Sequence, residues 1–167
     1  MKEIVGNILK VKEVDDTPVI AICFTSNGVV RKDGRAVMGA GVAKLFRDTF
    51  KNLDMKYAAT RGDERTNLTT DLGDWKLEDR ILRVIAFPTK NDWKYKSTIE
   101  LITLSAMRLR DIINKDPLLQ KGFILLPRPG CNNGHLEWDE VKKVLEPILP
   151  ENVAIITQDL SWKKDGK

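Results

Sequence analysis

The sequence predicts a three-layer α/β/α fold with a mixed, largely parallel central sheet. Apolar runs of strand length alternate with segments whose apolar residues recur every three to four positions, as on one face of a helix. This alternation is typical of parallel strands joined by helices that cover both faces of a sheet. With 167 residues, 42% of them hydrophobic, the chain (1–167) is expected to form a single domain with a full core.

Each expected strand is a short apolar run between turn residues. The strands are expected at 2–5, 18–24, 81–87, 122–126 and 152–157. The segment 71–80 predicts a hairpin before the third run, so the sheet is expected to be mixed. Helices are expected at about 40–60, 97–114 and 138–148.

The helix expected from Ser97 has a distinct start, because Ser97 and Glu100 are spaced as a capping box before an apolar stripe. At the other end of the chain, residues 160–167 are polar and charged, and we expect them to form a frayed tail.

Composition excludes several classes of protein. No run approaches the ~18 apolar residues of a membrane span, and the first residues form no apolar signal region, so we expect a cytoplasmic protein. Two cysteines, Cys23 and Cys131, and one histidine form no disulfide framework or metal-ligand spacing, so neither a metal nor a cofactor is expected. The net charge of +4 suits a nucleotide or nucleic-acid partner.

Two strand-to-helix turns are rich in glycine. The strand at 122–126 runs into 127–135 (Pro-Arg-Pro-Gly-Cys-Asn-Asn-Gly-His), and 38–43 (Met-Gly-Ala-Gly-Val-Ala) opens the first helix. Small residues let backbone N–H groups approach an anion, and a helix N-terminus adds partial positive charge. Each loop alone is equally explained as a simple turn. Together, at the carboxyl ends of strands, they predict a site that grips a diphosphate from both sides.

These residues resemble the macro domain family, whose members bind ADP-ribose. Residues 6–8 (Gly-Asn-Ile) look like the family's turn after the first strand, and Asn27 with 38–43 resembles its first phosphate loop. Residues 87–90 (Phe-Pro-Thr-Lys), followed by Trp93 and Ser97, resemble a narrower branch, as does 129–138. That branch contains the DarG antitoxins, which remove ADP-ribose from DNA bases, and enzymes that release it from protein carboxylates. Stand-alone bacterial and phage relatives share the longer first loop.

The resemblance implies a macro domain that binds ADP-ribose and hydrolyses an ADP-ribosyl bond, with a nucleic-acid base as the favoured attachment point. A non-catalytic ADP-ribose reader, or a phosphatase or deacetylase acting on free ADP-ribose derivatives, are the alternatives. The expected ligand-binding residues are Asn7, Ile8, Ser26, Asn27, Gly39, Ala40, Gly41, Val42, Pro129, Gly130, Cys131, Asn132, Asn133, Gly134 and His135.

Two positions depart from the family pattern, and the first loop is extended by the insertion 28–37. Asn7 stands where many macro domains carry an Asp that accepts a hydrogen bond from adenine, and the Asn oxygen can also accept one. Gly134 replaces the catalytic Asp of the protein-carboxylate hydrolases, which favours a DNA substrate. The insertion 28–37 carries three cations that either contact DNA or simply face water; they are Arg31, Lys32 and Arg35.

Lys90 follows directly on the strand 81–87, and the resemblance implies that it is catalytic. Its ammonium can give a proton to the departing group, or its free amine can attack the sugar carbon. The alternative is an exposed loop lysine.

Several residues in or beside these motifs have two possible roles. Asn27 either contacts a ribose or closes a turn, and Asn132 and Asn133 either orient the distal ribose or tolerate left-handed backbone. Trp93 either stacks on a base or covers the pocket, or it packs on the helix at Ser97. We expect Cys131 to be a packed small residue, Trp138 to be core, and His135 to be structural.

Overall fold

The computed structural model describes residues 1–61 and 67–158, so the tail expected at 160–167 lies outside the described residues. Its strands are β1 (Lys2–Gly6), β2 (Glu13–Val14), β3 (Thr17–Ser26), β4 (Thr70–Leu77), β5 (Arg80–Pro88), β6 (Phe123–Pro127) and β7 (Val153–Gln158). Its helices are α1 (Gly41–Thr49), α2 (Leu53–Arg61), α3 (Ile99–Lys115), the short 3₁₀ helix η1 (Pro117–Gln120) and α4 (Trp138–Leu145).

The strands form one mixed sheet in the order β1-β7-β6-β3-β5-β4, with β2 paired to β3. The neighbours from β1 to β5 are parallel, whereas β4 and β5 form an antiparallel hairpin. Both the mixed sheet and the hairpin predicted at 71–80 are therefore confirmed. The four central strands, β7, β6, β3 and β5, end at the same edge of the sheet, which brings the loops after β3, β5 and β6 together.

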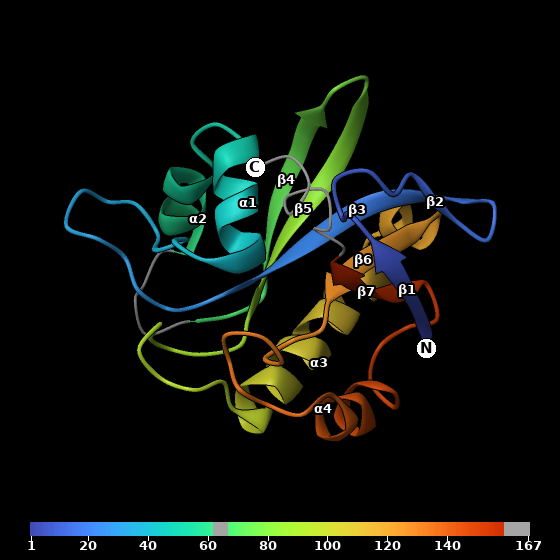
Figure 1. The fold of residues 1–167 in the computed structure, drawn as a ribbon. Helices are drawn as coiled ribbons and strands as arrows, with labels where there is room; N and C mark the ends of the chain where they lie inside the picture. The colour runs from blue at the N-terminus through green and yellow to red at the C-terminus, as the bar shows by residue number, and fades with distance from the viewer. Residues whose placement is uncertain (62–66, 159–167) are drawn as a thin grey trace, which may run out of the picture.

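Helices cover both faces of this sheet (Figure 1). Alternate residues of β3 point to opposite faces, so Ile22 and Phe24 join the core under α1 and α2, while Ala21 and Cys23 join the core under α3 and α4. All four side chains are completely buried. The three-layer architecture predicted from the alternation of elements is thus confirmed.

The single helix predicted at about 40–60 is wrong, because the structure has two. The first ends at Thr49, and Asn52 adopts a left-handed backbone with φ of 65° before the second begins. The buried aromatic residues continue across the break: Phe46 and Phe50 contact each other, and Tyr57 contacts Phe24 in β3.

The capping box predicted from Ser97 and Glu100 is also wrong. Thr98 is the N-cap of α3, and its side chain accepts a hydrogen bond from the Leu101 N–H. Ser97 is instead buried, and its backbone N–H donates to the carbonyl oxygen of Gly134. Contact with another loop, rather than local capping, fixes this residue.

Within the described ranges, every helix is too short or too polar to cross a lipid bilayer.

Candidate functional site

A cavity of about 670 Å³ lies at the edge of the sheet where the central parallel strands end. Its walls come from the last residues of β3, β6 and β7 and from the loops that follow β3, β5 and β6. This is the place where open α/β sheets bind ligands. Twelve of the sequence-predicted residues line it together: Ser26, Asn27, Gly39, Ala40, Gly41, Val42, Lys90, Gly130, Cys131, Asn132, Asn133 and Gly134.

The first glycine loop (residues 39–42) presents backbone to the cavity. A Cβ atom at Gly39 would have no neighbour within 4 Å, so the main chain there is open to a ligand. Gly41 has φ of 59° and begins α1, whose N-cap Ala40 makes no side-chain capping bond and whose first turn carries no acidic residue. The positive end of α1 therefore faces the cavity without a side-chain cap, as suits an anion site.

The second glycine loop (residues 129–135) closes against the first. A Cβ atom at Gly41 would stand 3.3 Å from Asn133 Nδ2, so the two loops meet at this point. Gly130 has φ of 73°, which favours glycine, and a side chain there would strike Ile102 and Leu136. The two loops thus approach each other at the cavity, as their shared position at the carboxyl ends of strands predicted.

Gly134 has no room for a side chain. A Cβ atom built there would lie 2.1 Å from Ser97 Oγ and 2.5 Å from the carbonyl oxygen of Gly130. Ser97 Oγ is buried and has no hydrogen-bond partner among the residues that the structure describes. The Gly134 backbone is therefore packed against the Ser97 side chain, and a carboxylate side chain at position 134 would push the loop away from Ser97.

Lys90 places its amine between the two halves of the site. Its Nζ lies 3.4 Å from the carbonyl oxygen of Trp93 and 3.4 Å from that of Asn133. Asn67 fixes the main chain below it, because its Nδ2 donates to the Lys90 carbonyl oxygen at 3.0 Å. The amine thus lines the cavity and is directed towards the second glycine loop by two carbonyl groups.

Four sequence-predicted residues stand outside the cavity lining: Asn7, Ile8, Pro129 and His135. Asn7 and Ile8 lie behind the wall that Gln158 forms. Gln158 Oε1 accepts from the Ile8 N–H at 2.9 Å, and its Nε2 donates to Asn7 Oδ1 at 3.3 Å. Gln158 thereby connects the turn after β1 to the cavity. The signal for Gln158 is its position at the carboxyl end of the last predicted strand, which sequence reasoning left unused.

Asn27 and Ser26 are both held by local hydrogen bonds. Asn27 Oδ1 accepts from the Val29 N–H, and Nδ2 donates to the Val37 carbonyl oxygen, so this side chain closes the insertion 28–37. Of the two roles predicted for Asn27, these bonds correspond to closing a turn. Ser26 Oγ bonds to the hydroxyl of Tyr57 at 2.9 Å.

The remaining side chains separate into packed and exposed groups. Burial raises the pKa of the Cys131 thiol to about 11, in keeping with a packed residue. Trp138, which was expected to be core, is only partly buried: it begins α4, packs against the core cluster and donates its indole N–H to Glu3. His135 has a left-handed backbone, with φ of 62°. Trp93 lines the cavity yet is 53% exposed, so it stands at the rim.

Further residues that were not among the expected ligand-binding residues also line the cavity. They are Thr25, Val37, Met38, Ala43, Thr89, Pro127, Arg128, Ile156 and Thr157. Arg128 is the charged member of this set, and its guanidinium stacks on Trp138, 4.9 Å from the ring centroid. It also lies 3.6 Å from Glu3.

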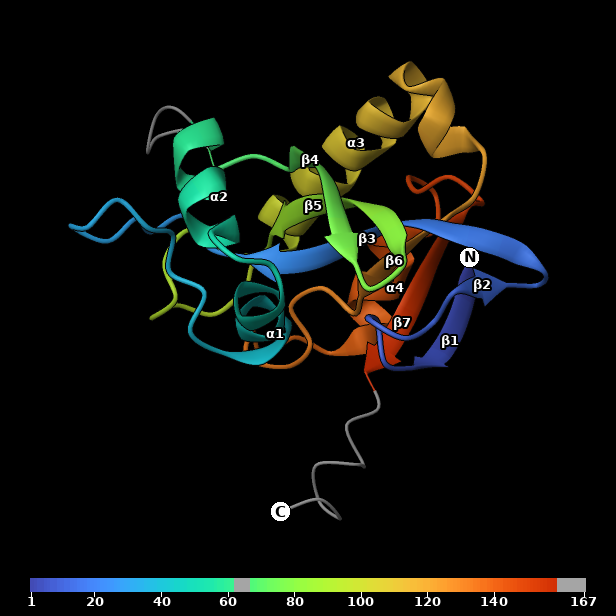
Figure 2. The ribbon, with the colours of Figure 1, turned by 90° about the horizontal axis from the view of Figure 1, so that it is seen from above.

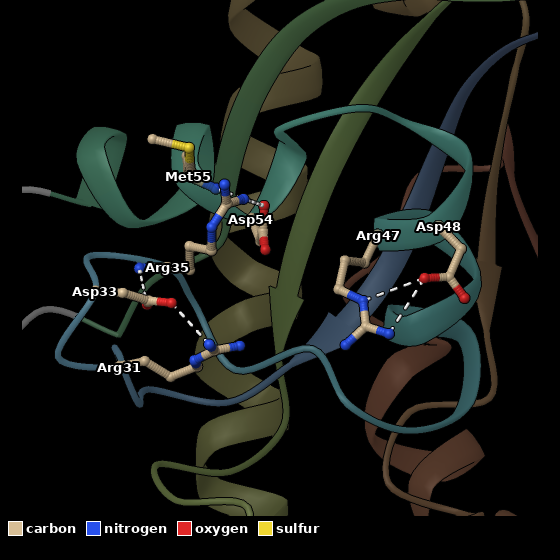
Figure 3. Close-up of polar contacts among 7 residues, drawn as sticks. All are labelled: Arg31, Asp33, Arg35, Arg47, Asp48, Asp54 and Met55. Atoms are coloured by element: carbon tan, nitrogen blue, oxygen red, sulfur yellow. Dashed lines mark hydrogen bonds and ion pairs between the residues drawn. The ribbon is translucent and has the colours of Figure 1, made fainter.

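The insertion 28–37 reaches out from the body of the molecule beside α2 (Figure 2). Arg35 is tied down by Asp54, which it meets at 2.9 Å and whose side chain is 8% exposed (Figure 3). Arg31 pairs with the exposed Asp33 in the same loop. Lys32 is exposed and makes no ion pair with any described residue. Within residues 1–61 and 67–158, no group of Cys, His, Asp and Glu side chains is arranged to hold a metal ion.

No family model matches the chain. It is 31% identical to the DNA ADP-ribosyl glycohydrolase of Thermus aquaticus over 148 residues, which make up 86% of this chain and 36% of that relative. The chain thus spans little more than a third of the relative's length.

Solved structures share the fold. The macrodomain of Thermus aquaticus DarG matches with a TM-score of 0.69 and 27% identity, over 95% of this chain and 97% of that one. Thermosipho africanus DarTG in complex with ADP-ribose matches with a TM-score of 0.67 and 20% identity, over 96% of this chain and 43% of that one. The sequence and structure comparisons agree with each other, and the chain is a macro domain of the DarG type.

Proposed function

We propose that this chain binds ADP-ribose and hydrolyses the bond that joins it to a base of DNA. The observation that carries the proposal is the Lys90 amine, which lines a cavity enclosed by two glycine loops. The relative from Thermus aquaticus is named a DNA ADP-ribosyl glycohydrolase, and the Thermosipho africanus structure contains ADP-ribose. Both names support the same ligand for this cavity.

The diphosphate is expected to lie between the loops. Backbone N–H groups at the start of α1 and in the second glycine loop donate to anionic oxygens without needing a charged side chain. The distal ribose then extends towards Lys90, whose Nζ is 3.4 Å from the Asn133 carbonyl oxygen in the second loop. This orientation brings the sugar carbon that bears the base to the amine.

The reaction breaks the bond between that sugar carbon and a ring nitrogen of the base. In one route the Lys90 ammonium donates a proton to the departing nitrogen while water adds to the carbon. In the other route the neutral amine forms a bond to the carbon, the base leaves with its electron pair and takes a proton, and water later displaces the amine. Both routes consume one water and release ADP-ribose and the unmodified base.

Gly134 supports DNA over protein carboxylates as the attachment point. The protein-carboxylate hydrolases that this chain resembles carry an Asp at this place, and here Ser97 Oγ lies 2.1 Å from where any Cβ would be. The loop therefore supplies no carboxylate at this position, and Lys90 is left as the titratable side chain expected to act on the bond.

The test is single-turnover release of ADP-ribose from a thymine-modified oligonucleotide, with a carboxylate-modified peptide run in parallel. Lys90→Ala is expected to slow release from the oligonucleotide at least ~100-fold, the low end for a positioned proton-transfer group. Its ADP-ribose affinity should stay within about tenfold, or 1.4 kcal/mol, because backbone groups hold the diphosphate. Lys56→Ala, on the exposed face of α2, is the matched control and should behave as wild type.

Three outcomes would contradict this assignment. Release from the peptide alone would move the substrate to protein carboxylates. Tight ADP-ribose binding without release from either substrate would make the chain a reader. Full activity of Lys90→Ala would remove the amine from the reaction. A sugar adduct trapped by a reductant would select the nucleophilic route.

We also propose that the chain works in the cytoplasm of a bacterium, or from a phage, as the reversing partner of a DNA-modifying toxin. The DarTG name of the Thermosipho africanus structure supports this setting. In the insertion 28–37, Lys32 and the exposed Arg31 are the cations proposed to meet DNA phosphates, since Arg35 is engaged with Asp54.

A further inference from the structure

Two large aromatic side chains stand exposed beside the cavity, in the segment Trp93–Lys96. Trp93 is 53% exposed and Tyr95 is 66% exposed, and both are followed by an exposed lysine, Lys94 and Lys96. Trp93 also lines the cavity, so the segment begins at its rim. Burying such rings usually stabilises a fold, so their exposure next to a ligand site calls for a partner.

No ion pair with a described residue engages the two lysines of this segment, Lys94 and Lys96. The nearest acid in the sequence, Asp92, uses its carboxylate to accept the Lys94 backbone N–H at 3.0 Å, which turns it towards the main chain. Lys94 Nζ lies 5.9 Å from the centroid of the Trp93 ring. Cations and rings therefore alternate along this segment.

Hydrogen bonds to Lys90 and to neighbouring main-chain groups hold the segment in place. Its first carbonyl group, on Trp93, accepts from Lys90 Nζ, and the Tyr95 N–H donates to the Asp92 carbonyl oxygen. Just before it, the Asn91 carbonyl oxygen accepts from the Gly28 N–H at 2.9 Å. The rings are thus presented from an anchored backbone, at a fixed distance from the amine that acts on the bond.

We propose that Trp93–Lys96 binds the nucleotides next to the modified base on a single strand of DNA. Bases stack on exposed aromatic rings whatever their sequence, and lysines between the rings meet the phosphates that link those bases. A stacked and paired base within a duplex could not enter the cavity, whereas a single strand can place one base inside and its neighbours on the rings. The proposal rests on the proposed function, because the cavity takes the modified base.

The test compares two substrates and two variants. Tyr95→Ala/Lys96→Ala changes side chains outside the cavity lining. It should raise KM for a modified single-stranded decanucleotide about tenfold or more, the scale of one lost stacking contact. It should leave hydrolysis of the modified mononucleoside within about twofold. The salt dependence of binding to the decanucleotide should become shallower, because one phosphate contact is lost.

The control variant is Leu118→Ala/Lys121→Ala, which removes an exposed apolar side chain and an exposed lysine at and just after η1. Gly122 packs against Pro18 and Ile20 near the start of β3, so this region lies at the opposite edge of the sheet from the cavity. Both substrates should be hydrolysed by this variant as by wild type.

Binding of unmodified single-stranded DNA, followed by fluorescence anisotropy, separates the two proposals. If Tyr95→Ala/Lys96→Ala binds this DNA more weakly but wild type hydrolyses neither substrate, the DNA-binding role of Trp93–Lys96 is supported and the proposed reaction is overturned. Equal binding and equal KM for both variants, with hydrolysis intact, would overturn this surface alone. A KM effect seen only with a carboxylate-modified peptide would assign the segment to a protein partner and overturn the proposal.

Discussion

Replacing Gly134 with alanine tests the packing on which the substrate assignment rests. The new Cβ would lie 2.1 Å from Ser97 Oγ, 2.7 Å from Ser97 Cβ and 2.5 Å from the Gly130 carbonyl oxygen, whereas ordinary contacts begin at 3.4 Å. Overpacking of this kind costs about 1–3 kcal/mol. Because one of the obstacles is backbone that cannot rotate away, we expect the upper part of that range, about 2–3 kcal/mol.

Thermal unfolding measures this cost. At about 2–4 °C per kcal/mol for a chain of this size, Gly134→Ala should lower Tm by about 4–12 °C. Gly39→Ala is the control, since a Cβ at Gly39 would have no neighbour within 4 Å, and its Tm should match wild type. Adding Ser97→Gly should restore part of the loss, but not all, because the contact with Gly130 remains.

A wild-type Tm for Gly134→Ala would refute the argument, since the loop would then accept a side chain freely. The same reasoning applies to Gly134→Asp. A carboxylate placed there alone should destabilise the loop without creating release of ADP-ribose from a carboxylate-modified peptide, and such release would show that the loop can adapt.

Three further predictions concern the ligand, a thiol and the insertion. Gly41→Glu should abolish ADP-ribose binding in calorimetry while circular dichroism stays native, because the carboxylate would occupy the anion site; retained affinity would exclude this loop as a phosphate site. Since burial raises the pKa of Cys131 to about 11, its thiol is protonated at neutral pH, and alkylation by iodoacetamide should accelerate only as the pH approaches that value; rapid alkylation at pH 7.5 would contradict its packing. Arg35→Ala leaves the nearly buried Asp54 unpaired and should lower stability in urea by about 1–3 kcal/mol, whereas Lys32→Ala should have no effect, and equal stability of both variants would count against the anchor.

The central strands β3, β5, β6 and β7 were predictable because each contains a buried apolar run, and their parallel pairing followed from their alternation with helices. The division between α1 and α2 was hidden, since Phe46, Phe50, Leu53 and Tyr57 keep helical spacing across it and are all buried. The break depends on the left-handed backbone of Asn52, a local property that an apolar pattern does not register.

Much of the cavity lining was predictable for a similar reason, because the glycines at the strand-to-helix turns mark where backbone faces the cavity. What remained hidden depends on contacts between distant segments. Ser97 looked like a helix cap, but its packing against Gly134, 37 positions away by sequence number, buries it. Gln158 lines the cavity and hydrogen-bonds to the turn after β1, more than a hundred residues earlier, and local sequence does not show that contact.

The parallel pairing of β1 with β7 has a practical consequence for handling the protein. Lys2 pairs with Ala154 near the start of β7, whereas Gln158, at the far end of that strand, lines the cavity. Met1 therefore stands at the edge of the sheet away from the two glycine loops. A surface or dye attached at this end of the chain would leave the cavity facing solution, so immobilised protein should keep the cavity open to the ligand proposed for it.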